Sequence, residues 1–193
     1  MNYKDYQKSR NATWEMLLDL GITELPIKIT DVCRRIGIPV KFADLGAEQD
    51  GCSAIVDGEP IIVINSLKRD NVARMRFTVA HELGHIMLGH VGVYELVNRE
   101  PSPEDNDIER QANIFASRLL APACVLWGCR VKSPEEIMRL CDISHQAAQF
   151  RYERMKVLYA RNKFLISPLE RAVFEQFKPF VLKYLLSQPR FEQ

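Results

Sequence analysis

The sequence lacks the runs of about 20 apolar residues that membrane-spanning helices need, although 47% of its 193 residues are hydrophobic. Residues 1–8 also lack the apolar core of a secretory signal peptide. An excess of one charge is missing too, because 26 basic residues stand against 25 acidic ones, so tight nucleic-acid binding is disfavoured. The composition predicts a globular protein in the cytoplasm that neither enters membranes nor binds DNA directly.

Paired cysteines are also lacking. The five cysteines are odd in number and do not show the close paired spacing of a zinc knuckle; they are Cys33, Cys52, Cys124, Cys129 and Cys141. We expect them to be reduced and mostly buried, where they serve as small apolar side chains.

The most informative segment that is present is His-Glu-Leu-Gly-His at residues 81–85. Two histidines four residues apart on a helix project from one face and can bind one metal ion. Glu82 lies between them, where its carboxylate can take a proton from water that the metal has activated. The motif predicts a zinc-dependent peptidase.

The residues around this motif agree with a buried helix that starts near Asn71. At about 100° per residue, Arg74, Thr78 and the two histidines with Glu82 fall in an arc from roughly 280° to 20°. The rest of the circumference is largely apolar, with Val72, Met75, Phe77, Val79, Ala80, Leu83, Ile86, Met87 and Leu88. Histidine and glutamate side chains in a largely buried helix need partners, and a metal ion would provide one.

The third metal ligand has two candidates. His90 follows His85 by five residues, but on a continuing helix it would point about 140° away unless Gly89 ends the helix first. Glu109 starts a second amphipathic run, in which Asn113 lies one turn further on the same side and can orient a histidine. The apolar residues of this run recur at helical spacing, at Ile108, Ala112, Phe115, Ala116, Leu119 and Leu120. We favour Glu109, because a histidine at a helix end commonly contacts the last carbonyl groups instead.

Five segments of this chain resemble the ImmA/IrrE family of metallopeptidases. They are residues 76–90, 109–122 and 61–65, Leu25-Pro26, and the end of a short helix at 36–40, and together they span most of residues 20–122. The segment at 109–122 is far more specific than the histidine motif. Ala121 stands where the family pattern usually has methionine before the proline, and this change affects no catalytic residue.

The resemblance implies an α+β, zincin-like fold in which a small mixed β-sheet packs on the metal-bearing helix. It also implies His81, His85 and Glu109 as ligands of Zn²⁺ and Glu82 as general base; Mn²⁺ suits the same ligands. Family members typically cleave a helix-turn-helix repressor and thereby relieve repression of mobile-element, phage or stress-response genes. The expected partner is such a repressor. The alternative is a non-catalytic, metal-containing regulator that binds and sequesters it.

Other patterns outline the core that we expect over residues 1–122. They predict a helix over about residues 4–20, a short helix after Thr30, a strand at 38–42, a hairpin of 52–56 with 61–64, and a loop over 91–106. The hairpin offers a strand edge that can pair with an extended substrate. Arg74 and Tyr94 are candidates for stabilising the oxyanion of the reaction.

The remaining residues, 123–193, predict a helical region. Ser133-Pro134 and Ser167-Pro168 are helix starts, and a break at 141–144 precedes a helix at about 145–159, which resembles a helix-turn-helix. We expect its basic residues to lie on a solvated face, and packing or substrate recognition is favoured over DNA contact; they are Arg151, Arg154, Lys156 and Arg161. An aromatic stripe predicts a buried last helix that Pro179 kinks or splits.

Overall fold

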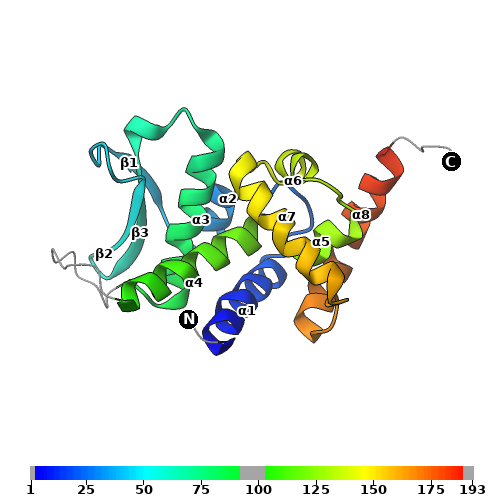
Figure 1. Cartoon of the computed structure of the whole chain (residues 1–193). Helices are drawn as coiled ribbons and strands as arrows, with labels where there is room; N and C mark the ends of the chain where they lie inside the picture. The colour runs from blue at the N-terminus through cyan, green and yellow to red at the C-terminus, as the bar shows by residue number, and fades with distance from the viewer. Residues whose placement is uncertain (1–2, 92–102, 189–193) are drawn as a thin grey trace. The chain divides into compact units, whose positions relative to one another are not determined.

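The computed structural model describes residues 3–91 and 103–188, and it is a mixed α+β structure (Figure 1). The chain divides into two compact units, one of Met1–Thr13 with Lys28–Leu120 and one of Trp14–Ile27 with Ala121–Gln193. The first residues of helix α1 (Tyr3–Asp19) thus belong to the first unit and its last residues to the second. The functional division at residue 122 stays a prediction.

The first unit holds the sheet and the helices that carry the motifs. After α1 it contains α2 (Ile29–Arg35), β1 (Val40–Ala43), β2 (Gly51–Val56), β3 (Glu59–Asn65), the short 3-10 helix η1 (Ser66–Lys68), α3 (Val72–Leu88) and α4 (Pro103–Leu120). The second unit contains α5 (Ala123–Gly128), α6 (Pro134–Cys141), α7 (His145–Ala160) and α8 (Pro168–Ser187). The expected α+β class with a small mixed sheet is confirmed.

The three-stranded sheet has the order β1-β3-β2. Strand β1 runs parallel to β3, while β2 runs antiparallel to β3 and forms an edge. Asp57 and Gly58 make a two-residue turn with φ of 53° and 83°, the left-handed values that such hairpins require. The predicted hairpin is confirmed, although its turn is shorter than expected because Glu59 and Pro60 already belong to β3.

Helix α3 covers the residues whose pattern predicts it, and its two ends are capped. The Asn71 side chain accepts a hydrogen bond from the Arg74 backbone N–H, and Gly89 adopts a left-handed φ of 76° after the last turn. Its middle is buried, with Leu83 fully so, but Val72 and Met87 near its ends are 53% and 43% exposed. The expected apolar face is therefore too wide, because Val72 and Met87, which it included, are exposed.

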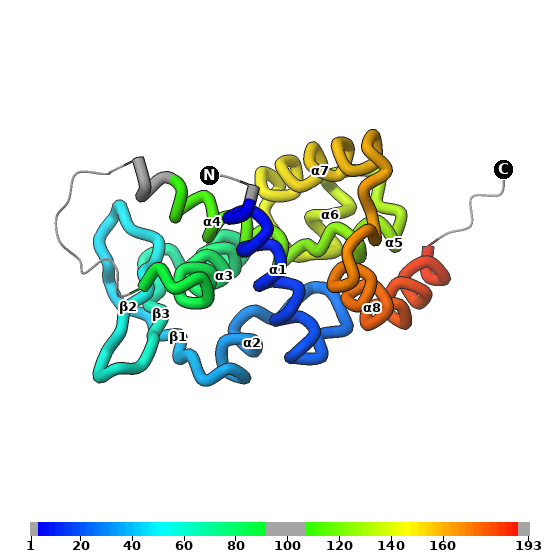
Figure 2. The backbone as a smooth tube through the Cα atoms, turned by 90° about the horizontal axis from the view of Figure 1, so that it is seen from below, coloured from blue at the N-terminus to red at the C-terminus, as the bar shows by residue number. Residues whose placement is uncertain are grey.

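Helix α3 packs against β2 and β3, and it also lies alongside α4 (Figures 1 and 2). The approach of the two helices is close at Gly84. A Cβ atom there would lie only 3.2 Å from the Ala112 Cα and from the Phe115 Cβ. Phe115 is fully buried at this contact. A larger residue at position 84 would therefore force α4 to shift away from α3, whereas glycine allows the observed approach.

Two predicted boundaries are wrong. The expected loop at 91–106 ends too late, because α4 already starts at Pro103. Residues 92–102 of that loop lie outside the described residues. Helix α2 starts at Ile29, so Thr30 lies inside it rather than before it.

The predicted helix starts of the second unit are confirmed. The hydroxyl of Ser133 accepts from the Glu136 N–H and that of Ser167 from the Glu170 N–H. Asp142, at a left-handed φ of 52°, ends α6 just before α7 begins. The predicted pair of short helices around a turn is therefore present.

Of two expectations for the second unit, one is settled in part and one is wrong. Pro179 does not split α8, which continues as one helix from Pro168 to Ser187, whereas the kink stays a prediction. Arg151 is not on a solvated face: it is 3% exposed, and its Nε donates to the Ala121 carbonyl oxygen at 2.7 Å. A buried carbonyl partner offsets the cost of burying this guanidinium group, and the sequence pattern alone does not reveal that partner.

The expected core of the second unit is confirmed in part of the aromatic stripe. Val173, Phe177 and Val181 are buried, and the other members of the stripe are half-buried, namely Phe174, Phe180, Tyr184 and Leu185. Leu182 and Leu186, on the same helix but outside the stripe, are 53% and 79% exposed. The amide of Gln176 ties α8 to the last turn of α1 and the residues after it, by donating to the carbonyl oxygens of Leu17 and Ile22.

The cysteine expectation is also confirmed. All five are free, and all but Cys52 are buried. Burial raises the pKa of Cys33, Cys124 and Cys129 to about 12, so these thiols stay protonated at neutral pH. Among the described helices, none has the length and apolar character that crossing a membrane requires.

The Gly84 contact generates the first prediction. Gly84→Val should lower the free energy of unfolding by about 2 to 3 kcal/mol, because the added side chain overlaps Ala112 and Phe115. Thermal unfolding followed by circular dichroism measures this. Ala172→Val, at an exposed position of α8, is the matched control and should cost well under 1 kcal/mol. An equal loss in both variants would show that the contact at Gly84 is not responsible.

Candidate metal centre

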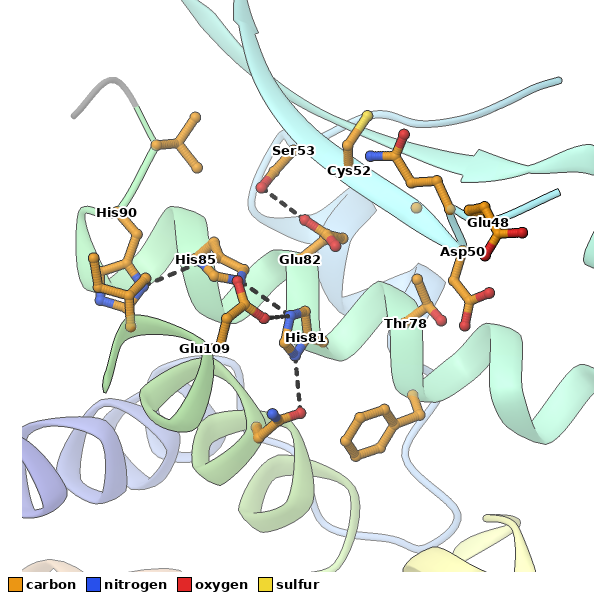
Figure 3. Close-up of a pocket in the computed structure, with 16 residues that line it drawn as sticks. Glu48, Asp50, Cys52, Ser53, Thr78, His81, Glu82, His85, His90 and Glu109 are labelled. Atoms are coloured by element: carbon orange, nitrogen blue, oxygen red, sulfur yellow. Dashed lines mark hydrogen bonds and ion pairs between the residues drawn. The ribbon is translucent and has the colours of Figure 1, made fainter. Parts of the chain in front are cut away.

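Successive turns of α3 bring His81 and His85 together. Their Nε2 atoms are 3.0 Å apart, and both side chains are mostly buried, at 15% and 12% exposure. Because four residues make slightly more than one turn, both rings point to the same side of the helix, as Figure 3 shows. Two ring nitrogens so close together need either a proton or a metal ion between them.

Glu109 reaches the same point from α4. Its Oε2 lies 3.1 Å from the His81 Nε2 and its Oε1 lies 3.2 Å from the His85 Nε2 (Figure 3). One donor atom from each of the three residues lies within 4.8 Å of the others, so the group could hold a metal ion. Two imidazole nitrogens and one carboxylate are a donor set that suits zinc and leaves a position open.

The second nitrogen of each histidine has its own contact. The His81 Nδ1 is 3.1 Å from the Asn113 Oδ1, and the His85 Nδ1 is 3.2 Å from the His90 Nδ1. These contacts orient both rings so that each Nε2 faces Glu109. The structure therefore places His90 behind His85, rather than within the group that faces the carboxylate.

The electrostatics agree with an anionic carboxylate at this centre. Hydrogen bonds from His81 and then His85 hold the pKa of Glu109 far below its usual range. Burial acts to lower the pKa of His81, but the hydrogen bond with Glu109 and the charges of Glu82 and Glu109 together raise it. Burial and the neighbouring His85 lower the pKa of His90 to about 4, so His90 is neutral at pH 7.

Glu82 lies next to this group but bonds elsewhere. It is 8% exposed, and its Oε2 accepts a hydrogen bond of 2.8 Å from the Ser53 hydroxyl on β2 (Figure 3). Sequence reasoning missed Ser53. The sequence offers only a weak signal for Ser53. Ser53 lies two residues after Gly51, and residues two apart on a strand lie on the same face of the sheet. A Cβ at Gly51 would lie 2.7 Å from the Thr78 Cγ2, so β2 approaches α3 closely there.

A pocket of about 690 Å³ opens in front of these groups, lined by residues from β2, α3, α4 and the loop before β2. Asp50 lies on this loop, and its carboxylate binds the Arg74 guanidinium through two hydrogen bonds and Lys68 at 2.6 Å. Arg74, a candidate for oxyanion stabilisation, is thus held by Asp50. Tyr94, the other candidate, lies outside the described residues.

Buried Asn65 holds the loop that forms this side of the pocket. Its amide nitrogen donates to the carbonyl oxygens of Gly46 and Gln49, each at 2.6 Å, and its amide oxygen accepts from the Leu67 N–H. Sequence reasoning gave Asn65 no such role, since the partners lie 16 to 19 residues away.

His145 belongs to the other unit and pairs with Glu135 at 3.5 Å.

Comparison with known proteins supports this description. The family model for the IrrE N-terminal-like domain, a peptidase family, matches residues 33–153, which is 121 of the 193 residues (153 − 33 + 1). The matched region contains the histidine motif and Glu109. No curated protein matches the chain. The chain thus belongs to the IrrE-like peptidase family that its motifs resemble, which indicates a metallopeptidase acting on a protein substrate.

Proposed function

We propose that this protein is a zinc-dependent metallopeptidase with His81, His85 and Glu109 as metal ligands and Glu82 as general base. The observation that carries the proposal is the convergence of three ligand atoms from two helices beside a buried carboxylate. Asn113 and His90 support the two histidines from behind. Bound zinc would polarise the scissile carbonyl and lower the pKa of water in its open position.

The side chains of this chain do the proton transfer. Glu82 takes the proton of the attacking water and delivers it to the leaving amine. The Ser53 hydroxyl holds the Oε2 of Glu82, which leaves Oε1 as the oxygen that carries the proton. A carboxylate fixed in this way loses little freedom when the reaction starts. Ser53 is therefore a positioning residue, since it acts through Glu82.

The expected substrate is a segment of a helix-turn-helix repressor, whose cleavage in the cytoplasm would relieve repression. Kinship with the family supports this substrate, and the pocket supports cleavage of an extended segment. Strand β2 is an edge strand, and Gly51, Cys52 and Ser53 line the pocket beside the candidate ligands. The unpaired edge of such a strand can bind the backbone of a peptide.

Metal content tests the ligand assignment. The wild-type chain, purified without added metal, should contain about one zinc per molecule, and Glu109→Ala should contain little because one of three protein ligands is lost. Elemental analysis measures both and also distinguishes zinc from manganese. Glu48→Ala, which removes another carboxylate from the same pocket, is the matched control and should keep its metal. Equal metal loss in the two variants would contradict the assignment.

Glu82→Gln and His85→Ala separate chemistry from metal binding. Glu82→Gln should keep the metal and lose cleavage by a factor of about 10² to 10⁴, because an amide cannot act as a base. His85→Ala should lose both. The assay follows the mass of a purified helix-turn-helix repressor by mass spectrometry during incubation. A Glu82→Gln protein that cleaves at the wild-type rate would remove the general-base assignment. A repressor that loses DNA affinity while its mass stays intact would favour sequestration.

Ser53 variants test the positioning of Glu82. Ser53→Ala should lower kcat about tenfold with little change in KM or metal content, because a hydrogen bond to a carboxylate is lost. Ser53→Thr keeps the hydroxyl and should recover most of the rate. Ile55→Ala, on the same strand, is the control. If Ser53→Ala and Ile55→Ala have the same kinetics, the hydrogen bond has no role in catalysis.

A further inference from the structure

The helical second unit contains a groove that none of the candidate site residues lines. It has a volume of about 910 Å³, and α5, α7 and α8 contribute to its walls. Its apolar lining includes Trp127, Val131, Phe174, Val181, Leu182 and Leu185. Leu182 is 53% exposed, so a large apolar side chain is left open to solvent in this groove.

The floor of the groove is closely packed. A Cβ at Gly128 would lie 2.6 Å from the Phe174 Cε2, so the end of α5 approaches α8 as nearly as a glycine allows. The Trp127 ring contacts Phe174 at a centroid distance of 5.5 Å and stacks on Phe164 at 5.6 Å. Such a floor is preformed and does not need to be assembled when something binds.

The polar lining of the groove is positive. It contains Arg130, Lys132, Lys156 and Lys178, and no carboxylate is among the described residues that line it. Lys156 and Lys178 each pair with a glutamate three residues earlier on their own helix. Arg130 and Lys132 are exposed, and within the described residues their side chains form no ion pair. The groove therefore combines an apolar floor with positive charge, of which that of Arg130 and Lys132 is not offset by an ion pair with any described residue.

We propose that this groove binds an acidic amphipathic helix of a partner protein. The residues of α8 that line it run from Phe174 to Leu185, a span of 11 residues (185 − 174) or about 16 Å. Three turns of a partner helix match this length and can present apolar side chains at i, i+4 and i+7 to the floor. Acidic residues flanking that apolar face would meet the cations of the rim.

A second copy of this chain suits the groove poorly. In a symmetric dimer the same groove would face itself, so the positive lining of one copy would face the positive lining of the other. Like charges placed together across an interface oppose association. The inference goes beyond the proposed peptidase activity and does not depend on it, because binding to the groove requires neither metal nor cleavage.

Peptide binding to the full chain tests the proposal. The probe is a fluorescent helical peptide of about 14 residues, roughly 20 Å long, with leucines at i, i+4, i+7 and i+11 and glutamates on its flanks. Fluorescence anisotropy should show saturable binding that weakens as salt rises from about 0.05 to about 0.3 M. The same peptide with lysines in place of glutamates should not bind. Equal binding of both peptides, or of neither, would overturn the proposal.

Matched variants locate the binding. Leu182→Glu should weaken the acidic peptide about tenfold, whereas Leu186→Glu, at a residue of the same helix that is more exposed and does not line the groove, should not. Lys132→Glu should weaken it as well, and Lys183→Glu should not. Circular dichroism and Tm verify that all four variants are folded. Equal effects within either pair would overturn the proposal. So would a dimer in analytical ultracentrifugation that Leu182→Glu dissociates, because the occupant would then be a second copy.

Discussion

The candidate metal centre depends above all on how closely α4 approaches α3. Glu109 is 24 residues after His85 (109 − 85), and only the packing of the two helices brings its carboxylate to the histidine nitrogens. Gly84 allows that packing, because its missing Cβ leaves room for Ala112 and Phe115. The same helix face of α4 also supplies Asn113, one turn after Glu109. A single close contact thus positions both a candidate ligand and the group that orients another.

A second close approach brings the sheet to the same helix. Gly51 lets β2 come near Thr78, and two residues later Ser53 reaches the buried Glu82. The two glycines therefore lie at two contacts of α3, one with the sheet and one with α4. The residues that line the pocket come mainly from β2, α3 and α4. Their positions therefore depend on how these three elements pack together and not on the local sequence of any one of them. These contacts explain how the Glu82 carboxylate can be buried near that of Glu109. The Ser53 hydroxyl and the neighbouring histidines offset the free-energy cost of burying its charge.

The second unit shows a different balance between burial and exposure. Its helices bury Phe177 and Val181 in a core and enclose Arg151 with a carbonyl partner, yet they leave Leu182 in an open groove with a positive rim. An exposed apolar surface of this kind commonly marks a site where another molecule binds. The proposed partner helix would give this unit a role in recognition, while the chemistry stays with the residues of the first unit.

Much of the centre follows from local sequence. Helix α3 and the shared face of His81 and His85 depend on contacts within a few residues, which is why periodicity predicts them. The hairpin is local in the same way, since a two-residue turn with Gly58 joins its strands. The resemblance to the family rests partly on α3 and more specifically on residues 109–122, and the family match confirms it.

Tertiary structure decided what local rules could not. The sequence left Glu109 and His90 as alternatives for the third ligand. The packing of α3 on α4 places Glu109 against the Nε2 atoms of both histidines, and His90 lies behind His85. Ser53 and Arg151 find partners 29 and 30 residues away, so their environments were invisible to periodicity. The sequence by itself determined the helix that presents the histidines, because its hydrogen bonds are local. Only the folded chain determined what meets them, because those contacts join distant segments.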